Sequence, residues 1–171
     1  AGVLQAERPD DVAFTSGGYA LRTVRVAQAG LYRVVPGPDG ANSSALYGPD
    51  GEPALPEYSI HEVNGVDVAV IGVVTEETPA LVTPAGIAGL TFGDPVEAVN
   101  RVAQEITASG EAQVVVAAYH EGAGSGVDTD ATLAEAVAES ATFAAIVNDT
   151  VAEVDAIFTG HTHKEYAWTA P

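Results

Sequence analysis

The chain has 171 residues, of which 47% are hydrophobic, so one domain with a sizeable core is expected and disorder is not. The net charge of −18, from 24 acidic and 6 basic residues, would repel a phosphate backbone, which excludes a nucleic-acid scaffold role. The absence of cysteine excludes disulfides, thiolate zinc sites and cysteine nucleophiles. No apolar run reaches the ~18 residues of a membrane span, and no signal peptide is visible, so we expect no membrane partner.

Residues 1–52 form the least regular part of the chain. Three apolar stretches predict short strands, at 12–15, 20–27 and 31–35. Two Gly-Pro-Asp-Gly sequences, at 37–40 and 48–51, predict turns, because proline presets the first corner and glycine accepts a positive φ.

Residues 58–74 show the pattern of a hairpin. Asn64-Gly65 separates two apolar arms and is a strong signal for a tight turn. The second arm, 66–74, is almost continuously apolar, as in a sheet covered on both faces. His61 lies in the first arm among polar neighbours and is interpreted as a solvent-facing strand residue. A long loop is expected over 76–93.

The second half alternates helices and strands. Asp94 followed by Pro95 predicts the start of a helix that ends at Gly110. Its apolar stripe comprises Val96, Val99, Val102, Ala103 and Ile106. Residues 112–119 predict a buried strand, 132–147 a single second helix, and 154–158 a last strand. This order predicts an α/β layered sheet.

Histidines follow two of these strands. His120 ends one strand, and Gly160-His161-Thr162-His163 follows the other. The carboxyl ends of parallel strands share one edge of a sheet, so all three histidines are expected there. Neutral imidazole is a good ligand for Zn²⁺, Mn²⁺ or Fe²⁺. A polar turn that happens to hold two histidines remains the competing interpretation.

Residues 160–163 resemble the closing G-H-x-H motif of the calcineurin-like metallophosphoesterases. Several further segments resemble, in order, bacterial 5'-nucleotidases with nucleotidase and cyclic phosphodiesterase activity: 58–75, 77–79, 94–100 and 114–122. The resemblance covers about residues 53–171. It implies the C-terminal half of a metallophosphoesterase-like domain, an incomplete layered β-sheet with flanking helices, preceded by the poorly matched segment 1–52.

The resemblance also implies a site and a function. His120 and His161 resemble ligands of one divalent metal ion, and His163 resembles a ligand of a second. Two ions of the zinc, manganese or iron class, ~3.5–4 Å apart, would activate water for attack on phosphorus. The implied activity is hydrolysis of nucleotides or other phosphate esters, and the implied location is extracellular or periplasmic. The chain starts at Ala1 rather than methionine, which is typical of a processed chain or of a piece of a longer parent.

Three motifs of that family are missing: the chain contains no D-x-H, no G-D-x-x-D and no G-N-H-E. No catalytic or substrate-binding residue can therefore be assigned, and whether the chain is an enzyme stays open. It is either an incomplete or degenerate catalytic domain, or a non-catalytic α/β module that binds at most one transition metal. A Rossmann-type dinucleotide binder is disfavoured, because no G-x-G-x-x-G follows a strand.

Two alignments of the N-terminal segment compete. Residues 11–18 followed by 31–36 resemble the substrate-binding domain of 5'-nucleotidases, with the order of domains reversed. Alternatively, residues 17–20 stand where G-N-H-E would fall, with Gly18 and Tyr19 in place of its asparagine and histidine. Neither alignment supplies an intact metal-binding motif.

Overall fold

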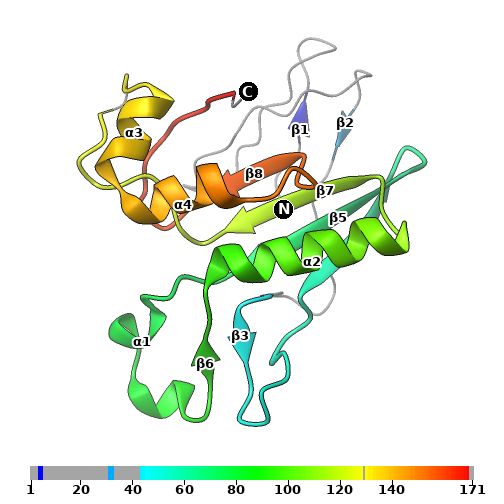
Figure 1. Ribbon diagram of the computed structural model, residues 1–171, viewed down its shortest axis with the longest axis horizontal. Helices are drawn as coiled ribbons and strands as arrows, with labels where there is room; N and C mark the ends of the chain where they lie inside the picture. Colours follow the sequence, from blue (N-terminus) through cyan, green and yellow to red (C-terminus); the bar gives the residue numbers. More distant parts are fainter. Residues whose placement is uncertain (1–3, 6–30, 33–42, 129, 170–171) are drawn as a thin grey trace.

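The computed structural model describes residues 4–5, 31–32, 43–128 and 130–169 (Figure 1). Its central feature is a four-stranded sheet in the order β4-β5-β7-β8. The strands are β4 (Tyr58–Val63), β5 (Val66–Val73), β7 (Val114–Tyr119) and β8 (Ala156–Thr159). β5, β7 and β8 run parallel, and β4 pairs antiparallel with β5 at the edge. The predicted layered α/β sheet is confirmed.

The hairpin between β4 and β5 forms where Asn64-Gly65 predicts it. Asn64 has φ 53° and Gly65 has φ 81°, and positive φ at both central residues is the requirement of a type I′ turn. The turn pairs Val63 with Val66 and thereby sets the register of both strands.

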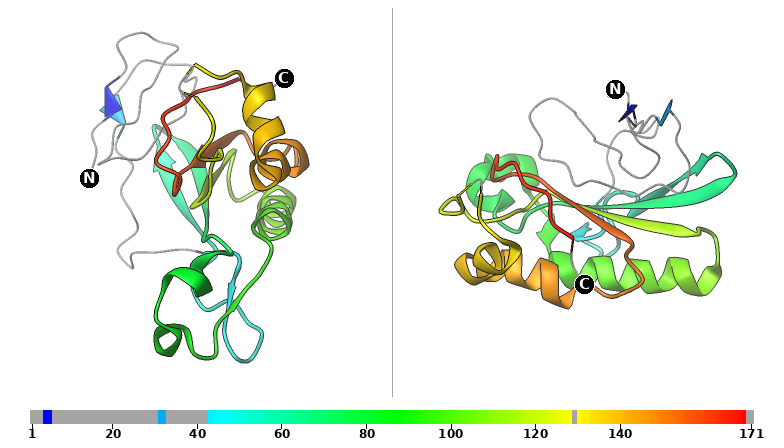
Figure 2. Two further views of the ribbon diagram at one scale, coloured as in Figure 1. Left: turned by 90° about the vertical axis from the view of Figure 1, so that its left-hand side faces the viewer. Right: turned by 90° about the horizontal axis from the view of Figure 1, so that it is seen from above.

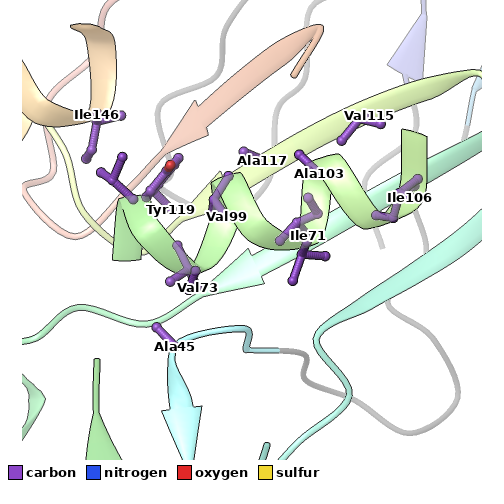
Figure 3. Close-up of a cluster of buried hydrophobic side chains, with 14 residues drawn as sticks. Ala45, Ile71, Val73, Val99, Ala103, Ile106, Val115, Ala117, Tyr119 and Ile146 are labelled. Atoms are coloured by element: carbon purple, nitrogen blue, oxygen red, sulfur yellow. The ribbon is translucent and has the colours of Figure 1, made fainter. Parts of the chain in front are cut away.

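Helix α2 (Pro95–Ser109) covers one face of the sheet and contacts β5 and β7. Its start is capped by Asp94, whose carboxylate accepts hydrogen bonds from the backbone N–H groups of Val96 and Glu97, at 2.8 and 2.9 Å. Gly110 ends it with φ 71°. The predicted apolar stripe is buried against the sheet, and Figure 3 shows Val99, Ala103 and Ile106 among the side chains of this core.

Removing the α2 cap gives a prediction about stability. Replacing Asp94 with alanine is expected to lower the free energy of unfolding by about 1 kcal/mol, because two N–H groups at the helix start lose their acceptor. Urea denaturation followed by circular dichroism measures the change. Asp94→Asn keeps a capping oxygen, so its free energy of unfolding should fall much less. Equal losses of stability in both variants would contradict the capping role.

The expected single helix over 132–147 is wrong. The structure has two helices, α3 (Leu133–Glu139) and α4 (Ala141–Asp149), separated at Ser140. Ser140 has extended backbone angles, φ −130° and ψ 118°, and its hydroxyl accepts a hydrogen bond from the N–H of Phe143 at 3.2 Å. A serine that caps a new helix breaks the helix, although the spacing of the apolar residues stays compatible with a single one. α4 lies on the same face of the sheet as α2 (Figure 2).

The expected long loop over 76–93 contains short elements. α1 (Thr78–Leu81) and the 3-10 helix Pro84–Ile87 precede β6 (Thr91–Phe92), which pairs antiparallel with β3 (Leu46–Tyr47). In Figure 1, α1, β3 and β6 lie together at the bottom of the view, on the opposite side of α2 from β8. Within the described residues, no helix combines the length and apolar character that crossing a bilayer requires.

The segment before β4 is partly described. β1 (Leu4–Gln5) pairs antiparallel with β2 (Leu31–Tyr32), and the predicted turn at 48–51 is confirmed by a 3.0 Å hydrogen bond from Gly51 N to Gly48 O. The strands expected at 12–15 and 20–27, the turn at 37–40 and most of both competing alignments lie outside the described residues. Ala45 is buried in the main core, while the division of the chain at residue 52 stays a prediction.

Candidate metal centre

The three parallel strands end at one edge of the sheet, and polar residues follow each of them. These residues are Thr75 and Glu77 after β5, His120 and Glu121 after β7, and His161 and His163 after β8. The parallel register therefore brings together side chains that are far apart in the sequence.

His120 and His161 lie side by side at this edge. Their ring centroids are 5.0 Å apart and the rings are inclined by 53°. Burial lowers the pKa of His120, and so do the neighbouring His161 and, less strongly, His163, whereas Glu121 acts in the opposite direction. The neutral imidazole is the form that binds metal ions. The structure thus brings two of the three predicted ligands together, and the lowered pKa of His120 favours the form of this side chain that binds metal.

Two carboxylates of this edge were not predicted as site residues. Glu77 contacts His161, with 3.2 Å between its Oε2 atom and the Nε2 atom of the imidazole. Glu121 accepts hydrogen bonds from the Thr75 hydroxyl at 2.8 Å and from the N–H of Gly122 at 3.0 Å. Their places after strand ends were the available signal, but acidic residues are too common in such loops to be singled out.

His163 follows His161 by two residues on the same loop. It is exposed, and both His161 and His163 have positive φ angles, 64° and 57°, which is uncommon for residues other than glycine. Across the part of the chain that the structure describes, no three His, Cys, Asp or Glu side chains are grouped as they would need to be to hold a metal ion. The ligand set of three histidines therefore stays a prediction.

A pocket of about 350 Å³ lies beyond the glycine-rich loop that follows His120. Its lining includes Asp128, Asp130, Glu135 and Glu139 and none of the predicted metal ligands. Four carboxylates disfavour a phosphate, so we do not assign this pocket to the substrate.

The loops that carry His120 and His161 approach each other at Gly122. A Cβ atom at Gly122 would lie 2.7 Å from Gly160 O and 2.8 Å from both Thr162 Oγ1 and the Tyr166 hydroxyl. Gly122→Ala is therefore expected to push the two loops apart and to lower the free energy of unfolding by about 1–3 kcal/mol. Thermal or urea denaturation measures this loss. Gly86→Ala is the control, since its Cβ meets nothing within 4 Å.

The chain has relatives among known proteins, although no family model matches it. It is 38% identical to endonuclease YhcR of Bacillus subtilis (strain 168) over 114 residues, which are 67% of this chain and 8% of that protein. It is 32% identical to a 5'-nucleotidase of Vibrio cholerae over 72 residues, 42% of this chain and 13% of the other. A cell wall protein of Listeria monocytogenes, Lmo0130, is 30% identical over 109 residues, 63% of this chain and 14% of that protein.

Among solved structures, the calcineurin-like phosphoesterase YfkN of Bacillus subtilis has a TM-score of 0.54 at 24% identity. The likeness covers 71% of this chain and 36% of the solved one, and it confirms the fold class. The chain spans only a small part of each relative that it matches. The relatives and the fold together support a partial domain of the metallophosphoesterase superfamily, as the sequence indicated.

Proposed function

We propose that the chain supplies the histidine half of a divalent-metal phosphoesterase site. The observation that supports this most directly is the pairing of His120 and His161, whose ring centroids are 5.0 Å apart although the two residues are 41 positions apart in the sequence. A polar turn with incidental histidines would not require a second histidine from another strand. The hydrolase class of the relatives points in the same direction.

The donors proposed here would serve one transition metal ion as a partial ligand set, because no group of three His, Cys, Asp or Glu side chains among the described residues is arranged to hold a metal. Two imidazoles with a carboxylate at hand, that of Glu77, suit an ion of the zinc, manganese or iron class. A bound ion would polarise a phosphoryl oxygen and lower the pKa of bound water. His120 and His161 would hold it, with His163 on the same loop as His161, and Glu77 would orient the His161 ring. The D-x-H and G-D-x-x-D motifs that would support a second ion are absent.

The substrates we propose are phosphate esters, nucleotides among them. One relative is named a 5'-nucleotidase and another an endonuclease, so both monoesters and diesters belong to this class. A small substrate fits the net charge of −18 better than a long nucleic acid does, because a local cation can offset that charge only nearby. A location outside the cell or at its surface is supported by the relative named a cell wall protein.

The second candidate is a non-catalytic module that binds at most one transition metal. The missing motifs favour it, as does the absence, among residues 43–128 and 130–169, of any group of three side chains suited to hold a metal. The module would keep the scaffold and the histidine pair without turning over a phosphate ester.

Metal content and turnover of the 171-residue chain separate the two candidates. The chain is stripped with a chelator, loaded with Zn²⁺ or Mn²⁺, dialysed and analysed by plasma emission spectroscopy. The same samples are then assayed with p-nitrophenyl phosphate, bis(p-nitrophenyl) phosphate and adenosine monophosphate. Bound metal with metal-dependent turnover supports the phosphoesterase. One bound ion without turnover supports the non-catalytic module. No bound metal would overturn the phosphoesterase and would leave only a module that binds no metal.

A further inference from the structure

Tyr166 lies between the two loops that carry the paired histidines. Its hydroxyl accepts a hydrogen bond from the backbone N–H of Ala123 at 3.0 Å and shares one with the Thr159 hydroxyl at 2.5 Å. Ala123 comes three residues after His120, and Thr159 comes two residues before His161. A single oxygen atom therefore joins the exit of β7 to the exit of β8.

Other contacts join the same two loops. The N–H of Gly160 donates to Glu121 O at 3.1 Å, and the missing side chain of Gly122 leaves room for the Tyr166 hydroxyl. Further along, Lys164 Nζ donates to Val127 O at 2.8 Å, and Trp168 Nε1 donates to Ala131 O at 3.1 Å. Residues 164–168 are thus fastened along the loop that follows His120.

The ring of Tyr166 is itself held in place. It stacks on Trp168 with ring centroids 4.4 Å apart, and it meets the buried Phe143 of α4 edge-on at 5.8 Å. Aromatic contacts of this kind restrict the ring, so the hydroxyl is directed at a constant position. Because α4 packs against α2 and α3, Tyr166 fixes the position of both loops relative to the helices.

We infer that Tyr166 is a positioning residue, which sets the spacing of His120 and His161 so that both can bind one metal ion. The inference rests on the proposed function for the metal itself. Tyr166 contacts neither imidazole in any hydrogen bond or ring pair described above; it acts through Ala123 and Thr159. Metal affinity depends on such outer contacts, because an ion binds tightly only where its ligands are already correctly spaced.

The test compares Tyr166→Phe and Thr159→Val with Tyr58→Phe. Tyr58→Phe is the control. It also removes one hydroxyl hydrogen bond, to Glu111 at 2.8 Å, but Tyr58 lies on the edge strand β4 and not on the loops that carry the histidines. Titration with Co²⁺ alone, read by visible absorption, gives the dissociation constant of each variant. Amide hydrogen exchange of Gly160 and Ala123, measured by NMR without metal, reports whether the two loops separate.

We expect Tyr166→Phe and Thr159→Val to raise the Co²⁺ dissociation constant by about tenfold and to speed exchange at Gly160, with Tyr58→Phe unchanged in both. If the wild-type chain binds Co²⁺ and Tyr166→Phe binds it with the same dissociation constant, the inference is overturned and the proposed function stands. If the wild-type chain bound no Co²⁺, the proposed function would fail instead. The amide exchange rates would then decide whether Tyr166 holds the two loops together. Unchanged rates in Tyr166→Phe would overturn this part of the inference as well.

Discussion

Replacing His161 with alanine is expected to weaken Zn²⁺ binding by at least about a hundredfold and to abolish any metal-dependent phosphoesterase turnover. The loss of an outer-shell partner already costs about 10–100-fold in affinity, and a direct ligand should cost more. His161 is also the only histidine that contacts both a second imidazole and a carboxylate in the described residues, His120 and Glu77. Isothermal titration with Zn²⁺ measures the change.

His61→Ala is the matched control for this substitution. His61 pairs with Val68 on β5, and Val68 pairs with Val114, the first residue of β7, whereas His120 follows the last. It therefore lies toward the opposite end of the sheet, where its Nε2 atom forms a 2.9 Å hydrogen bond with the Ser59 hydroxyl. Unchanged Zn²⁺ affinity in His161→Ala, or an equal loss in His61→Ala, would refute the assignment of the site.

Ile106→Ala is expected to cause the largest loss of stability, about 2–5 kcal/mol in the free energy of unfolding. Ile106 is fully buried and lies where α2 packs on the sheet (Figure 3). Removing three carbon atoms there loses apolar burial and leaves a cavity that the surrounding strands cannot fill. Urea denaturation, read by circular dichroism and by tyrosine fluorescence, measures the loss.

The control for the core substitution is Leu81→Ala. Leu81 ends α1 and is 61% exposed, so its loss should change the free energy of unfolding by less than about 0.5 kcal/mol. Similar losses for Ile106→Ala and Leu81→Ala would contradict the placement of the core. An unchanged denaturant slope in both variants would show that the comparison concerns the same unfolding transition.

The elements predicted correctly have strong local signals. Asn64-Gly65 specifies its own turn, since both residues tolerate positive φ. Asp94-Pro95 marks the start of α2 and Gly110 marks its end, and the stripe between them has helical spacing. Each of these signals lies within a few residues of the structure that it determines.

The sequence analysis missed one local competition and several contacts between distant segments. The apolar pattern of 132–147 is compatible with one helix or two, and the break at Ser140 comes from a hydroxyl that caps Phe143. β6 exists because Thr91–Phe92 finds β3 as a partner, and pairing with a distant segment leaves no mark on either sequence. The contact of Glu77 with His161 joins residues 84 positions apart and is equally invisible in the sequence.

The sequence by itself determined the α/β fold class, the strands that end in histidine and the likeness to metallophosphoesterases. Patterns of polarity and short motifs are local properties, so they can be read without the structure. Only the tertiary structure decided which histidines meet. His120 and His161 lie side by side because β7 and β8 are adjacent and parallel, and Glu77 joins them because β5 ends at the same edge. His163 follows on the same loop as His161 and is exposed, and its predicted role as a ligand stays a prediction. The direction of a side chain after a strand end depends on the backbone angles of a tight loop, and these angles depend on the neighbouring loop against which it packs.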